Sequence, residues 1–125
     1  MLASGYLDFL YKFMETLFTK IINKDIPADI IYEDDLSLVF KDINPQAPTH
    51  LLIIPKKPIP MLSDASKEDK EILGHLMWVA GEISRELGLD ETFRLVTNNG
   101  AKAGQSVFHL HLHLLSGRPL QWPPG

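Results

Sequence analysis

The stretch Gly104-Gln105-Ser106-Val107-Phe108-His109-Leu110-His111-Leu112-His113-Leu114-Leu115 sets three histidines in alternation with apolar residues. A β-strand repeats every two residues, so the three imidazoles would share one face of a strand. The opposite face would carry an apolar set suited to a core, made of Phe108, Leu110, Leu112 and Leu114. Three of the five histidines in the chain lie here, which makes this stretch the main chemical feature of the sequence.

The length and composition limit the class of protein. A chain of 125 residues fits one domain with a real hydrophobic core. It has no cysteine, which excludes disulfides and thiolate metal sites. The net charge of −4 argues against a nucleic-acid partner, and no apolar run approaches the ~20 residues that span a bilayer. We therefore expect a cytoplasmic protein without a membrane or nucleic-acid partner.

The first residues differ from the rest of the chain. Residues 1–14 match no later pattern, and they lack the basic start of a signal peptide. A well-patterned segment begins directly after Met14. We expect residues 1–14 to be an extension, with Met14 as the natural start, and residues 15–125 to form the domain.

The apolar patterns predict five strands, one short helix and one long helix. We expect the short helix over residues 16–23 and the long one over 66–87, beginning near Ser66 and ending at Gly88. The strands are expected over residues 30–33, 36–41, 49–55 and 92–98 and in the histidine stretch. The run over 49–55 is apolar throughout, which is typical of a central strand. Short connections favour an antiparallel sheet and hence an α+β fold.

The long helix carries more apolar surface than one sheet contact requires. One stripe consists of Ile72, Leu76, Val79, Ile83 and Leu87, and a second consists of Leu73, Met77 and Ala80, with Trp78 beside it. A stripe of this width indicates either deep burial or packing against a partner subunit.

Residue chemistry alone leaves three interpretations of the histidines. They could be structural, they could ligate zinc as alternate residues on a strand, or they could perform acid–base and nucleophilic chemistry on a phosphate. The preceding loop favours phosphate, because Gly100 and Gly104 allow the backbone to turn and expose N–H groups. Ser106 would add a hydroxyl. No acidic residue lies near the histidines in sequence to serve as a further zinc ligand.

The stretch from Gly104 to Leu115 resembles the histidine-triad motif, in which three histidines alternate with apolar residues. Most of the chain, from about Glu15 to Gly125, is similar to the Hint branch of that superfamily, the histidine-triad nucleotide-binding proteins. The similarity rests on residues 18–22, 25–28, 32–35, 41–50, 54–57 and 74–77 and on the closing Trp122-Pro123-Pro124-Gly125.

This resemblance implies a homodimer with a continuous sheet and hydrolysis of purine nucleoside phosphoramidates, in which AMP or GMP is joined to an amine. It implies no cofactor and no metal. His111 would be the nucleophile that forms a nucleotidyl-histidine intermediate, His109 would orient it, His113 would contact the phosphate oxygens or the leaving group, and His50 would be the fourth histidine. A nucleotide-binding scaffold and a dinucleoside polyphosphate hydrolase are the alternatives.

The resemblance also implies a nucleotide pocket. Three residues would hold the phosphate: Ser106, Gln105 and Asn98. Asp42 would bind the ribose hydroxyls, and the purine would lie against Phe18, Ile21, Ile26, Phe40 and Ile43. Trp122 would lie near the partner's site. Judged by their residue types alone, Asp42 and Asn98 are ordinary turn residues, and the apolar residues would be core in any fold.

Overall fold

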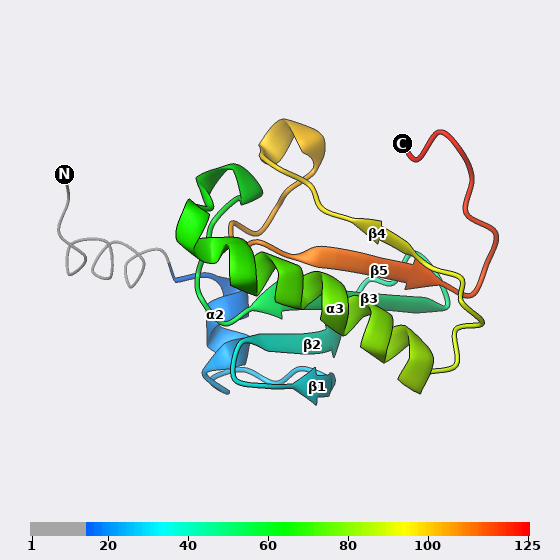
Figure 1. Ribbon diagram of the computed structural model, residues 1–125, viewed down its shortest axis with the longest axis horizontal. Helices are drawn as coiled ribbons and strands as arrows, with labels where there is room; N and C mark the ends of the chain where they lie inside the picture. Colours follow the sequence, from blue (N-terminus) through cyan, green and yellow to red (C-terminus); the bar gives the residue numbers. More distant parts are fainter. Residues whose placement is uncertain (1–14) are drawn as a thin grey trace, which may run out of the picture.

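A computed structural model describes residues 15–125, so the expected extension and the start at Met14 lie outside the described residues. Five strands form one sheet in the order β1-β2-β3-β5-β4 (Figure 1). Every neighbouring pair is antiparallel. The strands are β1 (Ile30–Glu33), β2 (Ser37–Lys41), β3 (Thr49–Pro55), β4 (Arg94–Val96) and β5 (Leu112–Ser116). The predicted α+β class and the five-stranded antiparallel sheet are confirmed.

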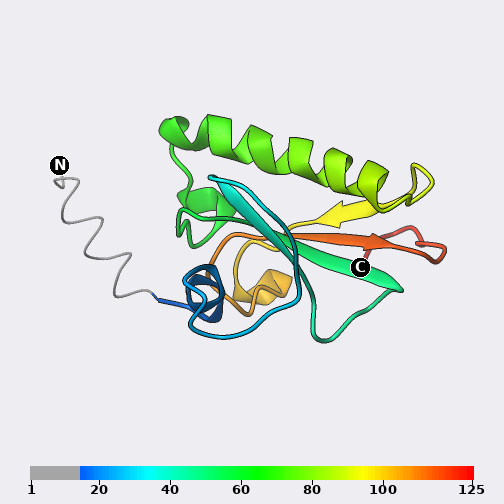
Figure 2. The ribbon, with the colours of Figure 1, turned by 90° about the horizontal axis from the view of Figure 1, so that it is seen from below.

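The two helices lie on opposite faces of the sheet. Figure 2 shows α3 (Lys70–Glu86) along one face, while α2 (Leu17–Ile22) and the turn after β4 lie on the other. The central strand β3 is buried on both sides, as its apolar run predicted. The core beneath α3 includes Val39, Leu51, Ile53, Leu76, Val79, Ile83, Leu110, Leu112 and Leu114. The core on the α2 side consists of Phe18, Ile21, Leu38, Phe40, Leu52 and Ile54.

The short helix begins where the sequence predicts. Thr16 is its N-cap, and its hydroxyl oxygen accepts hydrogen bonds from the N–H groups of Phe18 and Thr19. Such a cap satisfies N–H groups that the first turn cannot pair internally. Because the helix is fixed at this end, Phe18 and Ile21 are held against the sheet, with only 4% and 5% of their surfaces exposed.

The long helix begins later than expected. A 3-10 turn (Lys67–Asp69) precedes it, and the carboxylate of Asp69 accepts a 2.8 Å hydrogen bond from the N–H of Ser66, so Ser66 begins this turn and is not the cap of the long helix that we predicted. Leu76, Val79, Ala80 and Ile83 are buried. Met77 and Trp78 are 58% and 54% exposed, so the second apolar stripe is only partly covered by the rest of the described chain.

The histidine strand is shorter than predicted, because β5 begins only at Leu112. Before that residue, other segments replace the sheet partners: the N–H of Leu110 donates to the carbonyl of Ile59, and the hydroxyl of Thr97 donates to the carbonyl of His111. The apolar alternation still holds at Leu110, Leu112 and Leu114, which all belong to the core beneath α3. Phe108 does not, since it is 40% exposed, which corrects its assignment to the core.

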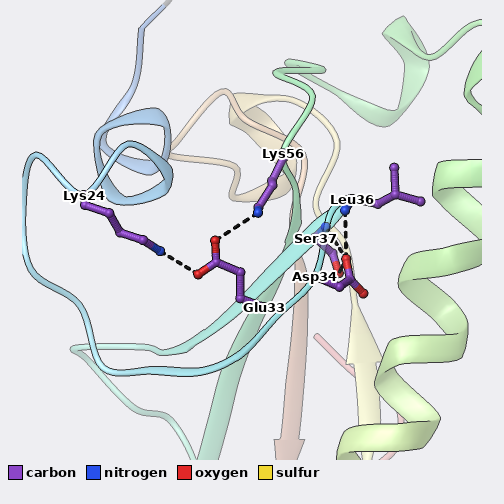
Figure 3. Close-up of polar contacts among 6 residues, drawn as sticks. All are labelled: Lys24, Glu33, Asp34, Leu36, Ser37 and Lys56. Atoms are coloured by element: carbon purple, nitrogen blue, oxygen red, sulfur yellow. Dashed lines mark hydrogen bonds and ion pairs between the residues drawn. The ribbon is translucent and has the colours of Figure 1, made fainter.

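The turn between β1 and β2 is held by the carboxylate of Asp34. It accepts hydrogen bonds from the N–H groups of Leu36 and Ser37 (Figure 3) and from the hydroxyl of Tyr32. Burial alone would raise the pKa of Asp34, but these hydrogen bonds outweigh it and hold that pKa well below its usual range. The carboxylate of Asp34 therefore holds the hairpin that joins β1 and β2.

The neighbouring Glu33 connects three segments of the chain. Its two carboxylate oxygens pair with Lys24 at 2.7 Å and Lys56 at 2.9 Å (Figure 3). These ion pairs join the segment after α2 to β1 and to the end of β3.

Neither helix of the described chain combines the length and apolar composition needed to cross a bilayer.

Candidate active site

A cavity of about 290 Å³ opens on the α2 side of the sheet. Its lining residues come from α2, from the loops after α2 and β2, and from the histidine stretch: Leu17, Phe18, Ile21, Ile26, Pro27, Ala28, Phe40, Lys41, Asp42, Ile43, Leu52, Ser106, Val107, His111 and His113. Nine of the fourteen residues that we singled out therefore meet in one cavity. A second cleft of about 360 Å³, just beyond the C-terminal end of α3, touches Asp42 and His50 but lacks His111 and Ser106, so it does not bring the predicted residues together.

The wall of this cavity is apolar and aromatic. The Phe18 ring packs edge-on against Phe40, with centroids 5.4 Å apart, and against His111, at 5.1 Å. Ile43 is 95% exposed at the rim. Sequence reasoning missed Leu17, Pro27, Ala28, Lys41, Leu52 and Val107. Most are neighbours of residues that it did identify, and their own types carry no chemical signature.

The hydrogen bonds of His111 fix where its proton lies. Its Nδ1 atom is 2.7 Å from the carbonyl oxygen of His109. A carbonyl only accepts, so Nδ1 must carry the hydrogen. The Nε2 atom of the neutral ring is then unprotonated, and its lone pair is the one that the ring can offer to a ligand in the cavity. The carbonyl of His111 is held in turn by the Thr97 hydroxyl at 2.9 Å.

His113 offers the cavity a hydrogen-bond donor, whereas His111 offers a lone pair. The backbone N–H of Gln46 donates to Nδ1 of His50 at 3.0 Å, so the proton of neutral His50 must lie on Nε2. That Nε2 lies 2.9 Å from Nδ1 of His113, which must therefore accept. Neutral His113 then carries its hydrogen on Nε2. His111 and His113, with ring centroids 4.9 Å apart, thus offer a lone pair and an N–H donor side by side.

His109 is not part of the cavity wall. It is 1% exposed, and its Nε2–H donates to the carbonyl of Pro55 at 2.7 Å. Its Nδ1 atom is buried and has no hydrogen-bond partner among the described residues. The neutral ring is therefore a fixed structural group, and what it offers His111 is its backbone carbonyl.

The environment favours neutral imidazoles. Burial is the largest cause that lowers the pKa values of His50, His109 and His111. Burial, followed by the charges of His111 and His50, lowers the pKa of His113 to about 4. The Asp42 carboxylate acts in the opposite direction on His50, His111 and His113. All four histidines are thus uncharged near neutral pH.

Asp42 lies at the junction of the histidines and the loop after β2. One carboxylate oxygen accepts a 2.8 Å hydrogen bond from the N–H of Asn44, as a turn residue would. The other lies 3.4 Å from Nε2 of His50. Asp42 is therefore both a turn residue and the anion nearest the histidine pair, and this second position was not predicted.

The glycine loop turns as predicted but does not expose its N–H groups. Gly100 and Gly104 have φ angles of +92° and +103°, which glycine adopts most readily. The N–H groups of Ala103 and Gln105 donate to the carbonyl of Gly100, and that of Gly104 donates to Ala101. These groups are used within the loop, so our expectation that they would face a phosphate is not met.

The predicted phosphate ligands differ in their placement. Ser106 lines the cavity. The buried amide of Gln105 is used internally: its oxygen accepts from the N–H of Gly100 at 2.8 Å, and its nitrogen donates to the carbonyls of Pro60 and Val107. Gln105 thus holds the loop that carries Ser106. Asn98 lies against Gly104 rather than in the cavity wall.

Trp122 is not among the residues that line the cavity. It is 82% exposed in the C-terminal segment. Its expected place near a partner's site concerns a second copy of the chain and stays a prediction.

An antiparallel sheet in which β5 and the segment directly before it bring His111 and His113 to one cavity defines a histidine-triad α+β protein. The family model of the HIT domain matches residues 23–120, and the chain belongs to this family. It is 62% identical over 111 residues to an uncharacterized HIT-like protein of Synechocystis, covering 89% of this chain and 97% of that protein. It is 50% identical over 112 residues to a 14 kDa zinc-binding protein of Zea mays, covering 88% of each. The crystal structure of a HIT family hydrolase from Legionella pneumophila superposes with a TM-score of 0.86 at 48% identity, covering 89% of this chain and 100% of that one.

Proposed function

We propose that this protein is a hydrolase of the Hint branch that cleaves the P–N bond of purine nucleoside 5′-phosphoramidates through a nucleotidyl-histidine intermediate. The observation that carries the proposal is the pairing of the lone pair on His111 Nε2 with the N–H on His113 Nε2 in one cavity. The similarity to the Legionella hydrolase supports the general class.

The cavity suits a nucleotide. Its apolar end, built on Phe18, Ile21 and Phe40, offers a purine an edge-and-face aromatic wall and flat apolar contacts. The histidines and Ser106 form the polar part of the same cavity, where the phosphate would lie. Asp42 and the rim residue Ile43 lie beside this polar part, and we assign Asp42 to the ribose hydroxyls.

In the first step, Nε2 of His111 attacks the α-phosphorus and the P–N bond breaks, with its electron pair passing to the leaving nitrogen. The hydrogen bond from Nδ1 to the His109 carbonyl keeps the attacking lone pair in place and offsets the positive charge that the ring gains. The covalent intermediate divides one difficult displacement into two easier ones.

The leaving nitrogen needs a proton, which we assign to His113. The free site is neutral, so His113 takes up this proton on Nδ1 when the substrate phosphate arrives, because an adjacent anion raises the pKa of an imidazole. Asp42 acts in the same direction. The Nε2–H of His50 can then no longer donate to His113, and it turns to the Asp42 carboxylate, 3.4 Å away. In the second step, water attacks the phosphorus, the bond to His111 breaks, and a proton returns to the solvent or to His113. The products are the nucleoside monophosphate and the free amine.

The test is turnover of an adenosine phosphoramidate with all metal chelated, for the parent and for His111→Ala. We expect turnover and a nucleotidyl adduct, detected by intact-protein mass spectrometry, in the parent and neither in the variant. A nucleotide-binding scaffold would bind AMP but form no adduct, and a dinucleoside polyphosphate hydrolase would prefer the dinucleotide. Full activity without His111 would reject the mechanism.

We also propose a cytoplasmic homodimer with a continuous sheet. β4 is the last strand of the sheet in the described chain, and Met77 and Trp78 expose an apolar part of α3. A second copy could pair with this strand edge and cover that surface.

A second candidate function is binding of a divalent cation. Asp42, His50 and His113 each offer a ligand atom, all within 4.8 Å of one another, and the maize relative is named for zinc binding. However, His50 and His113 are hydrogen-bonded at 2.9 Å, while two nitrogens on a tetrahedral zinc lie about 3.3 Å apart. A zinc ion would displace that hydrogen bond. Zinc that stimulates turnover would favour this candidate, and zinc that inhibits it would favour the hydrolase.

A further inference from the structure

The orientation of the N–H on His113 follows from the tautomer of His50, which one backbone group outside the cavity helps to fix. The Asp42 carboxylate, 3.4 Å from Nε2 of His50, favours the same tautomer. The N–H of Gln46 is the donor that places the proton of His50 on Nε2. Without it, neutral His50 could carry the proton on Nδ1 instead. His50 Nε2 would then accept from His113 Nδ1, and His113 would show the cavity a lone pair rather than a donor.

The segment after β5 holds the loop that contains Gln46. Nε of Arg118 donates to the carbonyl of Gln46 at 3.1 Å, and Nη1 of Arg118 donates to its neighbour Pro119 at 2.9 Å. The preceding Gly117 has a φ of +95° and packs closely on the loop, since a Cβ there would lie 2.8 Å from Cβ of Pro48. The segment after β5 and the loop thus meet at two contacts. In one of them, Arg118 and Gln46 are 72 residues apart in the chain.

We propose that Arg118 is a positioning residue for the proton-donating half of this site: it fixes Gln46 so that His50 and His113 keep the tautomers that turn an N–H into the cavity. In its catalytic consequence this inference rests on the proposed hydrolysis. Arg118 is not among the lining residues of the cavity, and its described hydrogen bonds go to Gln46 and Pro119 rather than to a histidine. The nucleophile is independent of it, because the Nδ1 and carbonyl of His111 are held by His109 and Thr97.

The primary test measures tautomers and needs no activity. Long-range ¹H–¹⁵N spectra of histidine-labelled protein distinguish the two neutral tautomers of each ring. In the parent we expect His50 and His113 with the proton on Nε2 and His111 with the proton on Nδ1. Arg118→Met keeps the apolar stem of the side chain but removes its hydrogen-bond donors. It should give a mixture of the two neutral tautomers at His50 and His113, while the tautomer of His111 is unchanged.

Three further variants sharpen the test. Arg118→Lys restores a donor and should return the spectra toward those of the parent. Gly117→Ala leaves Arg118 in place but pushes on Pro48, so it should shift His50 as Arg118→Met does. Arg85→Met is the matched control, because Arg85 is an exposed arginine on α3 paired only with Glu82 in the described hydrogen bonds and salt bridges. Unchanged His50 tautomers in Arg118→Met would overturn the proposal.

Kinetics separate this inference from the proposed function. With an alkylamine phosphoramidate, Arg118→Met should lower kcat about three- to tenfold, the size expected for one lost hydrogen bond, with little change in KM. If the parent has no phosphoramidase activity but Arg118→Met still shifts the tautomers, the proposed function is rejected and the positioning role stands. If the parent is active but Arg118→Met changes neither the tautomers nor kcat, the positioning role is rejected and the proposed function stands.

Discussion

The Nδ1 atom of His111 lies 2.7 Å from the carbonyl oxygen of His109, two residues earlier in the chain. This contact forms because the segment before Leu112 has left the β-ladder, which frees a carbonyl that a regular strand would point at its neighbour. It leaves Nε2 as the only basic atom of the His111 ring. The irregular backbone at this point is therefore part of the chemistry that we assign to the site.

The first prediction separates His109 from His111. His109→Ala removes a buried ring but keeps the carbonyl, so we expect the free energy of unfolding to fall by about 2–4 kcal/mol while turnover stays within about tenfold of the parent. Chemical denaturation and steady-state kinetics measure the two effects. His109→Gln, which keeps a donor for Pro55, should recover part of the stability. A loss of turnover as complete as that of His111→Ala would contradict this division of roles.

The sequence predicted the elements that depend on local patterns. The alternation of Leu110, Leu112 and Leu114 placed the histidines on one side, and the apolar run of β3 identified the central strand. The turn at Asp34 and the short helix capped at Thr16 follow from neighbouring residues only. These features are set within a few residues, which is the range that periodicity and capping rules describe.

What the sequence could not predict depends on distant partners. β5 begins at Leu112 because Ile59 and Thr97 take the backbone groups before it. The amide of Gln105 is used by Pro60, 45 residues away, rather than by a ligand. The protonated nitrogen of His50 is chosen by Gln46, whose residue type is irrelevant because its backbone N–H makes the contact.

The second prediction concerns the rim of the cavity. Ile43 is 95% exposed, so Ile43→Ala should leave the melting temperature unchanged. If the side chain covers a bound purine, the lost apolar contact should weaken AMP binding about three- to tenfold. Calorimetric titration measures this change. Leu36→Ala, an exposed apolar residue outside the cavity, is the control and should bind AMP as the parent does. Unaltered affinity in Ile43→Ala would remove this residue from the nucleotide site.

The third prediction tests the dimer. Trp78 is a large exposed apolar residue on α3, and such residues often dominate the energy of an interface. Trp78→Glu should raise the dimer dissociation constant by roughly 30-fold or more, the equivalent of about 2 kcal/mol. Light scattering over a dilution series measures it. Leu62→Glu places the same charge at an exposed leucine in the turn (Leu62–Asp64) before α3, outside the exposed Met77 and Trp78, and should remain dimeric. A folded parent that is monomeric at high concentration would refute the dimer.

The last prediction follows from the lowered pKa values of the buried histidines. A histidine that is harder to protonate in the folded protein contributes its full stability above the unfolded pKa of about 6.5, and this stability is lost as the pH falls toward the folded value. For His113 that window runs from about 6.5 down to about 4. Within it, each such histidine adds a slope of up to about 1.4 kcal/mol per pH unit.

The carboxylates with lowered pKa values, Glu33, Asp34 and Asp69, act mainly at the acid end of this range and below it. Urea denaturation at intervals between pH 7 and pH 5 therefore isolates the histidines. We expect the free energy of unfolding to fall across this interval in the parent and to fall less steeply in His113→Gln, which cannot take up a proton. Equal slopes in the two proteins would show that His113 is not held neutral by burial, and a flat profile in the parent would extend that conclusion to His50, His109 and His111.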